Sequence, residues 1–196
     1  MNRFDKKFWK QKYNKNKTGW DIGYASTPLQ IYFEQLTSAD KNISILIPGG
    51  GNGYEAEFLC RMGFNNVHLL DIVKQPLKNL HKRLPNFPEK NLINADFFKH
   101  QGNYDIIIEQ TFFCALDPQL RKEYAKKMHE LLADNGKLVG LLFDFPLTDQ
   151  GPPFGGSKQE YLDTFSGLFA IKVMEKSYNS IKERSGMEQF IIFEKL

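Results

Sequence analysis

The stretch "LIPGGGNGYEAEFL", residues 46–59, places four glycines within five positions, between an apolar run and a helix-like segment. A strand that ends at Pro48 and turns through glycines into a helix lets a ligand approach bare backbone at a helix N-terminus. Asp71 ends the next apolar run, 20 residues after Gly51, where a carboxylate is placed to accept the hydroxyls of a ribose. The two features together predict a site for a nucleotide-like cofactor. The alternative is a tight strand-to-helix turn in which Asp71 caps the following helix.

Outward from this turn, apolar runs alternate with helical patterns, the order typical of βαβ units with a parallel sheet. The expected strands are residues 43–47, 66–71, 91–95, 105–109, 137–143, 169–174 and 188–194, and the last two are expected to pair as a hairpin. The clearest expected helices are residues 4–15, 28–38, 119–133 and 159–165, the third of them ending at Asn135-Gly136. The pattern predicts an α/β, Rossmann-like fold: a seven-stranded, mostly parallel sheet with a C-terminal antiparallel hairpin and helices on both faces.

The length of 196 residues suits one domain, which we expect to span residues 1–196. Within it, residues 1–40 are expected to form an N-terminal helical lid. The Pro/Gly-rich stretch "DFPLTDQGPPFGGSK", residues 144–158, is expected to form an active-site loop.

The amino-acid composition limits which kinds of protein the chain can be. Hydrophobic residues make up 41% and charged residues 25% of the chain, with no secretory signal and no apolar run near the roughly 20 residues that cross a bilayer. We therefore expect a soluble, cytoplasmic protein. Two cysteines 54 residues apart and four scattered histidines show no metal-ligand spacing, so no metal is expected.

Charge is unevenly placed. Residues 1–17 hold seven Lys/Arg against one acid, which leaves 19 basic against 22 acidic residues in the rest of the chain. Such an arm can bind nucleic acid, but a solvated helix face is the commoner reason for it.

The glycine turn alone does not decide the cofactor. Residues 51–56 fit the G-x-G-x-x-A form of a dinucleotide fingerprint, so an NAD-dependent oxidoreductase is one interpretation. The chain offers no second mononucleotide-binding half, which favours S-adenosylmethionine (AdoMet). Asp96 in "NADFF" is then placed to accept from an adenine amino group, with Phe97 against the ring. Glu109 and Gln110 end the fourth strand, at the edge of the sheet where ligands bind.

Several motifs resemble those of one family, the thiopurine and thiol S-methyltransferases with the plant halide/thiocyanate methyltransferases. They are "FWKQKYNKNKTGWDIG", "LIPGGGNGYE", "LLDI", "NADFF", "IIIEQTFFCAL" and "GPPF", which cover nearly the whole chain. The resemblance implies a class I AdoMet-dependent methyltransferase in which aromatic residues ahead of the sheet close over the cofactor. It implies these cofactor-binding residues: Trp9, Tyr13, Trp20, Gly49, Gly51, Asp71, Ile72, Asp96, Phe97 and Gln110.

The chain departs from the family pattern at four positions. Tyr13 stands where Trp is common, Gln110 where Tyr or Arg is common, Glu109 in place of Asp, and Tyr24 in place of Arg. These departures bear on substrate preference more than on cofactor binding.

The expected reaction is methyl transfer to a small soft nucleophile (a thiol, thiocyanate, hydrosulfide or halide) by in-line displacement in a desolvated aromatic pocket. The candidate pocket residues are Asp21, Glu109, Phe113, Phe154 and Arg184. Asp21, Glu109 and Asp144 are candidate proton acceptors, and no pattern favours one of them, so no catalytic residue is assigned. The expected partner is a small-molecule thiol or anion, and neither a metal, a membrane nor a nucleic acid is expected; the sequence does not decide the oligomeric state. An NAD-dependent oxidoreductase and an RNA-binding or nucleic-acid methyltransferase module that uses the basic N-terminal helix remain the alternatives.

Overall fold

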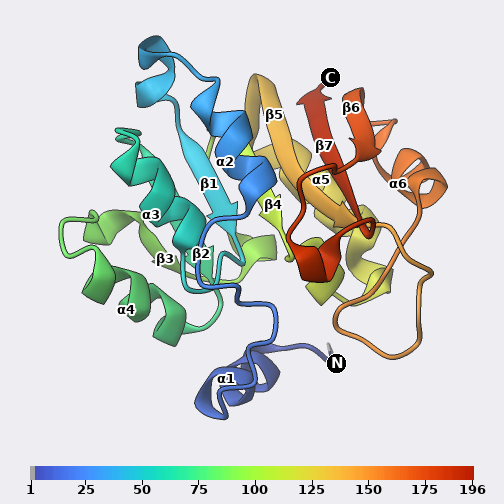
Figure 1. The fold of residues 1–196 in the computed structure, drawn as a ribbon, viewed down its shortest axis with the longest axis horizontal. Coiled ribbons are helices and arrows are strands. Elements are labelled where there is room, and N and C mark those ends of the chain that lie inside the picture. The colour runs from blue at the N-terminus through green and yellow to red at the C-terminus, as the bar shows by residue number, and fades with distance from the viewer. Residues whose placement is uncertain (1–2) are drawn as a thin grey trace. The chain divides into compact units, whose positions relative to one another are not determined.

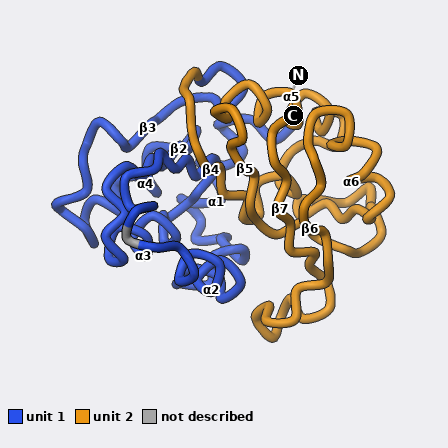
Figure 2. The backbone as a smooth tube through the Cα atoms, turned by 90° about the horizontal axis from the view of Figure 1, so that it is seen from above, with its two compact units in different colours: residues 1–100 blue, residues 101–196 orange. Residues whose placement is uncertain are grey.

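The computed structural model describes residues 3–196, apart from the side chain of Ser38. Met1 and Asn2, the first residues of the expected lid, lie outside this range. The chain divides into two compact units, residues 1–100 and 101–196, drawn in blue and orange in Figure 2. A single domain over residues 1–196 stays a prediction.

The first unit holds three parallel strands: β1 (Ile45–Pro48), β2 (Val67–Asp71) and β3 (Leu92–Asn94). β1 pairs with β2 from Ile45 opposite Val67, and β2 pairs with β3 from Leu69 opposite Leu92. Every residue of β1 is buried, as its unbroken apolar sequence predicts for an internal parallel strand.

Four helices and three short 3-10 turns complete this unit: α1 (Lys6–Asn14), α2 (Thr27–Glu34), η1 (Ser38–Asn42), α3 (Tyr54–Arg61), α4 (Lys74–Arg83), η2 (Glu89–Asn91) and η3 (Phe97–Lys99). α3 and α4 pack against β2 (Figure 1). Asp5 caps α1, its carboxylate accepting from the Phe8 amide at 2.9 Å. No side chain of α1 is buried.

The second unit contains β4 (Tyr104–Gln110), β5 (Leu132–Phe143), β6 (Phe169–Lys176) and β7 (Glu188–Lys195). β4 and β5 are parallel, whereas β7 runs antiparallel to both β5 and β6. The helical elements are η4 (Phe113–Ala115), η5 (Pro118–Leu120), α5 (Arg121–Leu131), α6 (Lys158–Phe165) and η6 (Lys182–Arg184). The expected C-terminal hairpin is therefore confirmed as β6–β7.

The seven strands form a sheet in the order β3-β2-β1-β4-β5-β7-β6, mostly parallel with an antiparallel C-terminal part. The predicted fold class is confirmed. No helix among residues 3–196 is both long enough and apolar enough to span a bilayer.

Two predicted helix ends were wrong. The helix expected to run to residue 38 ends at Glu34. The helix expected to close at Asn135-Gly136 ends at Leu131, and β5 begins at Leu132. Leu132 already has extended backbone (φ −81°, ψ 140°) and lies opposite Tyr104. Asn135 adopts its left-handed conformation (φ 60°) inside the strand segment instead. The Asn-Gly pair thus marks a bend between two paired stretches and not a helix end.

Candidate functional site

The glycine turn, residues 49–53, joins β1 to α3 through left-handed backbone. The φ angles are 59°, 53° and 73° at Gly49, Gly51 and Gly53. Side chains with a Cβ are strained at such angles, so the local conformation itself selects glycine.

Close packing adds a second constraint on the turn. A Cβ on Gly50 would lie 2.3 Å from Cδ1 of Leu69, and one on Gly53 would lie 2.7 Å from Cδ2 of the same leucine. A Cβ on Gly51 would instead lie 3.3 Å from the hydroxyl oxygen of Tyr13. Gly50 and Gly53 therefore make room for the core of the unit itself, whereas Gly51 faces the N-terminal segment.

Asp71 ends β2 beside this turn and is 6% exposed. Its Oδ2 accepts from the Gly51 amide at 3.2 Å and its Oδ1 from the Val73 amide at 2.7 Å. Burial raises the pKa of this carboxyl to about 6, against the lowering effect of those two hydrogen bonds. The alternative in which Asp71 caps the following helix is wrong, because the N-cap of α4 is Val73 and no side chain caps that helix. The carboxylate instead joins the end of β2 to the glycine turn through the Gly51 amide.

The three aromatic residues of the N-terminal segment lie together. The ring centroids of Trp9 and Trp20 are 5.4 Å apart and those of Tyr13 and Trp20 are 5.8 Å apart, both edge to face. Burial raises the pKa of Tyr13, and the nearby carboxylate of Asp71 raises it further. The structure therefore brings the predicted trio together and places Tyr13 and Trp20 beside Gly51.

Residues 94–98 shape the end of β3. Asp96 is half-buried, and its Oδ1 accepts from the Phe98 amide at 3.0 Å, which caps η3. Phe97 is buried, with its ring edge-on to that of Phe98. Asn94, which sequence patterns did not single out, donates to the carbonyls of Asp71 and Ile72 at 2.9 and 3.0 Å.

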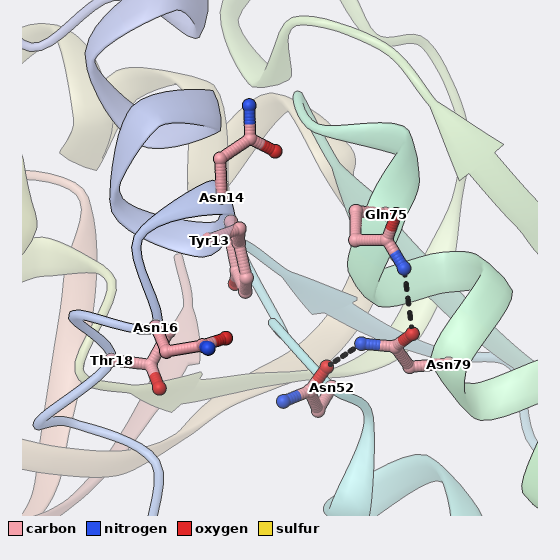
Figure 3. Close-up of a pocket in the computed structure, with 7 residues that line it drawn as sticks. All are labelled: Tyr13, Asn14, Asn16, Thr18, Asn52, Gln75 and Asn79. Atoms are coloured by element: carbon pink, nitrogen blue, oxygen red, sulfur yellow. Dashed lines mark hydrogen bonds between the residues drawn. The ribbon is translucent and has the colours of Figure 1, made fainter.

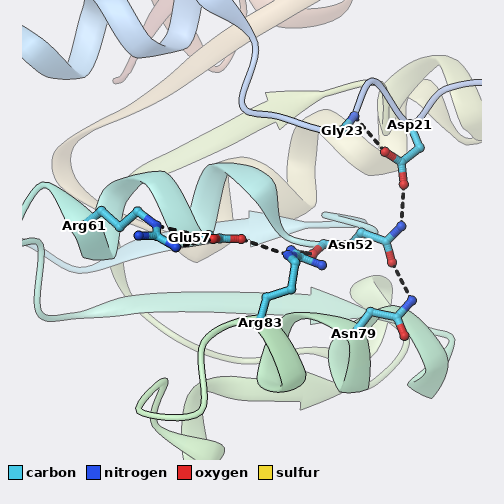
Figure 4. Close-up of polar contacts among 7 residues, drawn as sticks. All are labelled: Asp21, Gly23, Asn52, Glu57, Arg61, Asn79 and Arg83. Atoms are coloured by element: carbon cyan, nitrogen blue, oxygen red, sulfur yellow. Dashed lines mark hydrogen bonds and ion pairs between the residues drawn. The ribbon is translucent and has the colours of Figure 1, made fainter.

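A chain of side-chain amides runs from the N-terminal segment to α4. The amide of Asn52 donates to the carboxylate of Asp21 and accepts from Asn79 at 2.8 Å (Figure 4). Asp21, expected in the substrate pocket, therefore binds the glycine turn. Asn52 and Asn79 were missed because an isolated asparagine in a turn or on a helix carries no chemical signature.

These amides line a polar cavity of about 270 Å³ in the first unit (Figure 3). Its lining side chains carry amide or hydroxyl groups and no formal charge: Tyr13, Asn14, Asn16, Thr18, Asn52, Gln75 and Asn79.

In the second unit, Glu109 is fully buried at the end of β4. Its Oε1 accepts from the amides of Phe112 and Phe113, both at 2.8 Å, and its Oε2 accepts from the Tyr124 hydroxyl. Burial raises the pKa of this carboxyl to about 7. Both oxygens are thus engaged in holding the turn that follows β4.

The phenylalanines expected in the pocket are also buried. Phe113 is 2% exposed, and its ring centroid lies 5.0 Å from that of Tyr124 and 5.8 Å from those of Tyr161 and Phe165. Phe154 is 5% exposed and anchors the Gly/Pro-rich loop, since its amide donates to the Cys114 carbonyl at 2.8 Å. Phe113 thus belongs to the aromatic core of this unit.

Arg184, a candidate pocket residue, is buried, with 8% of its surface exposed. Its Nη1 lies 3.6 Å from Oε1 of Glu188, and its guanidinium carbon is 5.9 Å from the Phe143 ring centroid. Asp144, which follows Phe143 in the chain, accepts from the Gln189 side chain at 2.6 Å. Gln110 is half-buried as the last residue of β4.

Arg121 was also missed by sequence reasoning. It is 3% exposed, donates to the Gly155 carbonyl at 2.7 Å and pairs with Glu160, and its guanidinium carbon lies 4.6 Å from the Phe113 ring centroid. Arg121 therefore ties the start of α5 to the Gly/Pro-rich loop. Its partners are 34 and 39 residues away, so no local pattern indicates the contact.

Comparison with known proteins now adds a decisive observation. The sequence matches the thiopurine S-methyltransferase (TPMT) family over residues 4–195. The chain belongs to this family. It is therefore an AdoMet-dependent methyltransferase, and the NAD-dependent oxidoreductase interpretation is wrong.

Similar members of this methyltransferase family come from plants and bacteria. The chain is 30% identical over 190 residues to probable thiol methyltransferase 2 of Arabidopsis thaliana, covering 92% of this chain and 81% of that protein. It is 30% identical over 188 residues to thiocyanate methyltransferase 1 of Brassica oleracea, with the same coverage. Thiopurine S-methyltransferase of Vibrio campbellii is 26% identical over 206 residues, covering 95% of this chain and 94% of that one.

Solved structures agree on the fold of this methyltransferase. The 1,6-didemethyltoxoflavin-N1-methyltransferase of Burkholderia thailandensis, solved with S-adenosylhomocysteine, matches with a TM-score of 0.78 at 15% identity, covering 97% of this chain and 86% of that one. A TehB-like methyltransferase from Corynebacterium glutamicum matches with a TM-score of 0.67 at 14% identity, covering 97% and 98%.

The first unit of the methyltransferase fits AdoMet by its chemistry. A sulfonium is attracted to aromatic rings, and Trp9, Tyr13 and Trp20 form a ring cluster whose Tyr13 hydroxyl and Trp20 indole nitrogen lie beside Gly51. Asp71 adds a carboxylate acceptor at the same turn. Within residues 3–196 no three His, Cys, Asp or Glu side chains are arranged to hold a metal ion.

Proposed function

We propose that this methyltransferase methylates a small soft nucleophile (a thiol, thiocyanate, hydrosulfide or halide) by in-line displacement in a pocket that excludes water. Relatives that bear the names thiol, thiocyanate and thiopurine methyltransferase support this range of acceptors. The acceptor is a small molecule, with no nucleic-acid or membrane partner.

The observation that carries the proposal is the state of the three candidate proton acceptors. Glu109 is fully buried with both oxygens engaged, Asp21 bonds Asn52, and Asp144 bonds Gln189. Glu109 has no exposed surface, and Asp21 and Asp144 are each held by a side-chain partner, so none of the three is free to approach an acceptor and take its proton. The reaction therefore favours acceptors that arrive as anions, such as thiocyanate, halides and ionised thiols.

We assign the cofactor to the glycine-turn side of the chain. AdoMet supplies a methyl group on a sulfonium, which is activated by its own charge. Asp71 would accept hydrogen bonds from the ribose hydroxyls, and the rings of Trp9, Tyr13 and Trp20 would cover the sulfonium. The full set of proposed cofactor contacts is Trp9, Tyr13, Trp20, Gly49, Gly51, Asp71, Ile72, Asp96, Phe97 and Gln110. Holding two reactants in line in this way is worth about 7–11 kcal/mol.

We assign the acceptor to residues of the second unit. Phe154 is held in the Gly/Pro-rich loop, and Arg184 near Phe143, although 3.6 Å from the carboxylate of Glu188, is a cation that can attract an anionic acceptor. The Arg121 contact with Gly155 keeps this loop in place.

The test is a transfer assay with labelled AdoMet against iodide, thiocyanate, hydrosulfide and an aromatic thiol between pH 5.5 and 8.5. The rate with thiocyanate should not depend on the ionisation of the acceptor, whereas the rate with each thiol should follow the thiolate fraction of that thiol. Transfer to RNA alone, or a thiol rate that follows one enzyme pKa whatever the pKa of the thiol, would contradict the proposal.

A further inference from the structure

Asn52, in the middle of the glycine turn, is fixed from two directions. Its Oδ1 accepts from Asn79 of α4 at 2.8 Å, and its backbone carbonyl accepts from Arg83 (Figures 3 and 4). Arg83 is in turn held by Glu57 of α3, with 2.8 Å between Nε and Oε2. The amide group of Asn52 donates to Asp21. The turn therefore presents one oriented N–H group to the N-terminal segment.

Asp21 is oriented to meet that donor. Its Oδ1 accepts from the Gly23 amide at 2.9 Å, which leaves Oδ2 for Asn52. A hydrogen bond to a charged acceptor is roughly twice as strong as a neutral one. The contact spans 31 residues of sequence and joins the N-terminal segment to the turn.

The segment that Asp21 anchors is otherwise held lightly. The side chains of residues 5–24 are exposed or half-buried, whereas Phe4 and Ala25 on either side are buried. A segment with few buried contacts opens at low cost in free energy. Tyr13 and Trp20, which lie at Gly51, are both carried on it.

We propose that Asn52 is a positioning residue for AdoMet: its hydrogen bond to Asp21 holds residues 5–24, the lid segment, over the glycine turn and so controls how tightly the cofactor is retained. Asn79 and Arg83 serve this contact by fixing Asn52. This role rests on the proposed placement of AdoMet at the glycine turn, but it does not depend on the choice of acceptor.

The hydrogen-bond pattern provides a rescue experiment. In Asn52→Asp two carboxylates face each other, and the contact becomes repulsive. In the double variant with Asp21→Asn, the amide introduced at position 21 donates to the carboxylate introduced at position 52. The amide oxygen at position 21 can still accept from Gly23, and the carboxylate at position 52 can still accept from Asn79. The bonds to Gly23 and Asn79 and the bond between residues 21 and 52 are therefore restored with the charge moved across, while Tyr54, which also bonds Asp21, loses a charged partner.

Two readouts report on the lid segment in the full chain. The first is the Kd for AdoMet from calorimetry. The second is acrylamide quenching of tryptophan fluorescence without cofactor, because both tryptophans of the chain, Trp9 and Trp20, lie on the lid segment. Gln75→Ala is the matched control, since Gln75 bonds Asn79 at 2.9 Å but lies one step farther from Asp21.

We expect Asn52→Ala to raise the Kd about tenfold and to increase quenching, with an unfolding midpoint close to that of the parent. Asn52→Asp should raise the Kd further, and in the exchanged pair the Kd should return to within about threefold of the parent value. Gln75→Ala should change little. If Asn52→Ala leaves both readouts unchanged, or the exchanged pair binds no better than Asn52→Asp, the proposal is wrong. If Asn52→Asp does not fold, Asn52→Ala and the exchanged pair decide. No acceptor is used, so a mistaken acceptor class leaves this outcome unaffected.

Discussion

Replacing Asp71 by Asn tests the cofactor site most directly, because the change keeps the shape of the side chain and removes its charge. The carboxylate accepts from Gly51 on one oxygen and from Val73 on the other. An asparagine can serve one of these donors with its oxygen, but its NH₂ group then faces the other. Because Asp71 is 6% exposed, solvent does little to relieve that mismatch.

The magnitude follows from the pKa. Burial raises the Asp71 pKa from 3.8 to about 6, and each pKa unit is worth about 1.4 kcal/mol. Ionising this carboxyl in the cofactor-free protein therefore costs about 3 kcal/mol more than ionising an exposed aspartic acid. A carboxyl whose folded pKa is raised binds its proton more tightly when folded. Its contribution to stability is therefore present below pH 4 and is lost as pH rises to about 6. Asp71→Asn should remove this part of the pH dependence of unfolding.

Cofactor binding should show the opposite trend. Hydroxyl donors on a ribose favour the ionised carboxylate, so AdoMet should bind with release of a proton. If only the ionised form binds, the Kd should fall about tenfold between pH 5 and pH 7, following a group of pKa about 6.

Calorimetry in two buffers of different ionisation enthalpy measures both the Kd and the released proton. Asp71→Asn should bind at least tenfold more weakly at pH 7.5, with a Kd that no longer changes through pH 6. A parent protein whose Kd is constant from pH 5 to 7, or a variant that binds as well as the parent, would refute the placement of the ribose on Asp71.

Three further outcomes follow from packing and hydrogen bonding. Gly53→Ala should lower the unfolding midpoint more than Gly63→Ala, because both glycines have positive φ (73° and 89°) but only the Cβ at residue 53 meets Leu69, at 2.7 Å; equal losses would show that backbone strain alone matters. Glu109→Gln should flatten the fall in thermal stability from pH 5 to pH 7, because the buried carboxyl has its pKa raised to about 7 and destabilises the fold as it ionises; an unchanged pH profile would exclude Glu109 as its source. Arg121→Met should make residues 151–157 more sensitive to proteolysis and raise the KM for the acceptor with little change in that for AdoMet, and equal KM changes would argue against a loop-specific role.

The sequence by itself determined the strands, the glycine turn and the position of Asp71. These features are local: β-branched apolar runs favour buried strands, and left-handed backbone selects glycine. The order of strand, turn, helix and acid therefore fixed the fold class before any contact was known. The aromatic trio also emerged from sequence, through motif resemblance.

Tertiary structure alone decided what the polar side chains do. Glu109 and Asp21 are candidate proton acceptors by sequence. In the structure, Glu109 accepts hydrogen bonds from backbone amides of the turn after β4 and from the Tyr124 hydroxyl, and Asp21 accepts one from Asn52. Gly50, which was not among the expected cofactor contacts, makes room for Leu69.

Arg121 and Arg184 are buried although arginine is usually exposed. The physical reason is that hydrogen-bond partners and burial depend on which elements come together in space. The partners of Asn52 and Arg121 lie 27 to 39 residues away in the chain, beyond the reach of any local pattern.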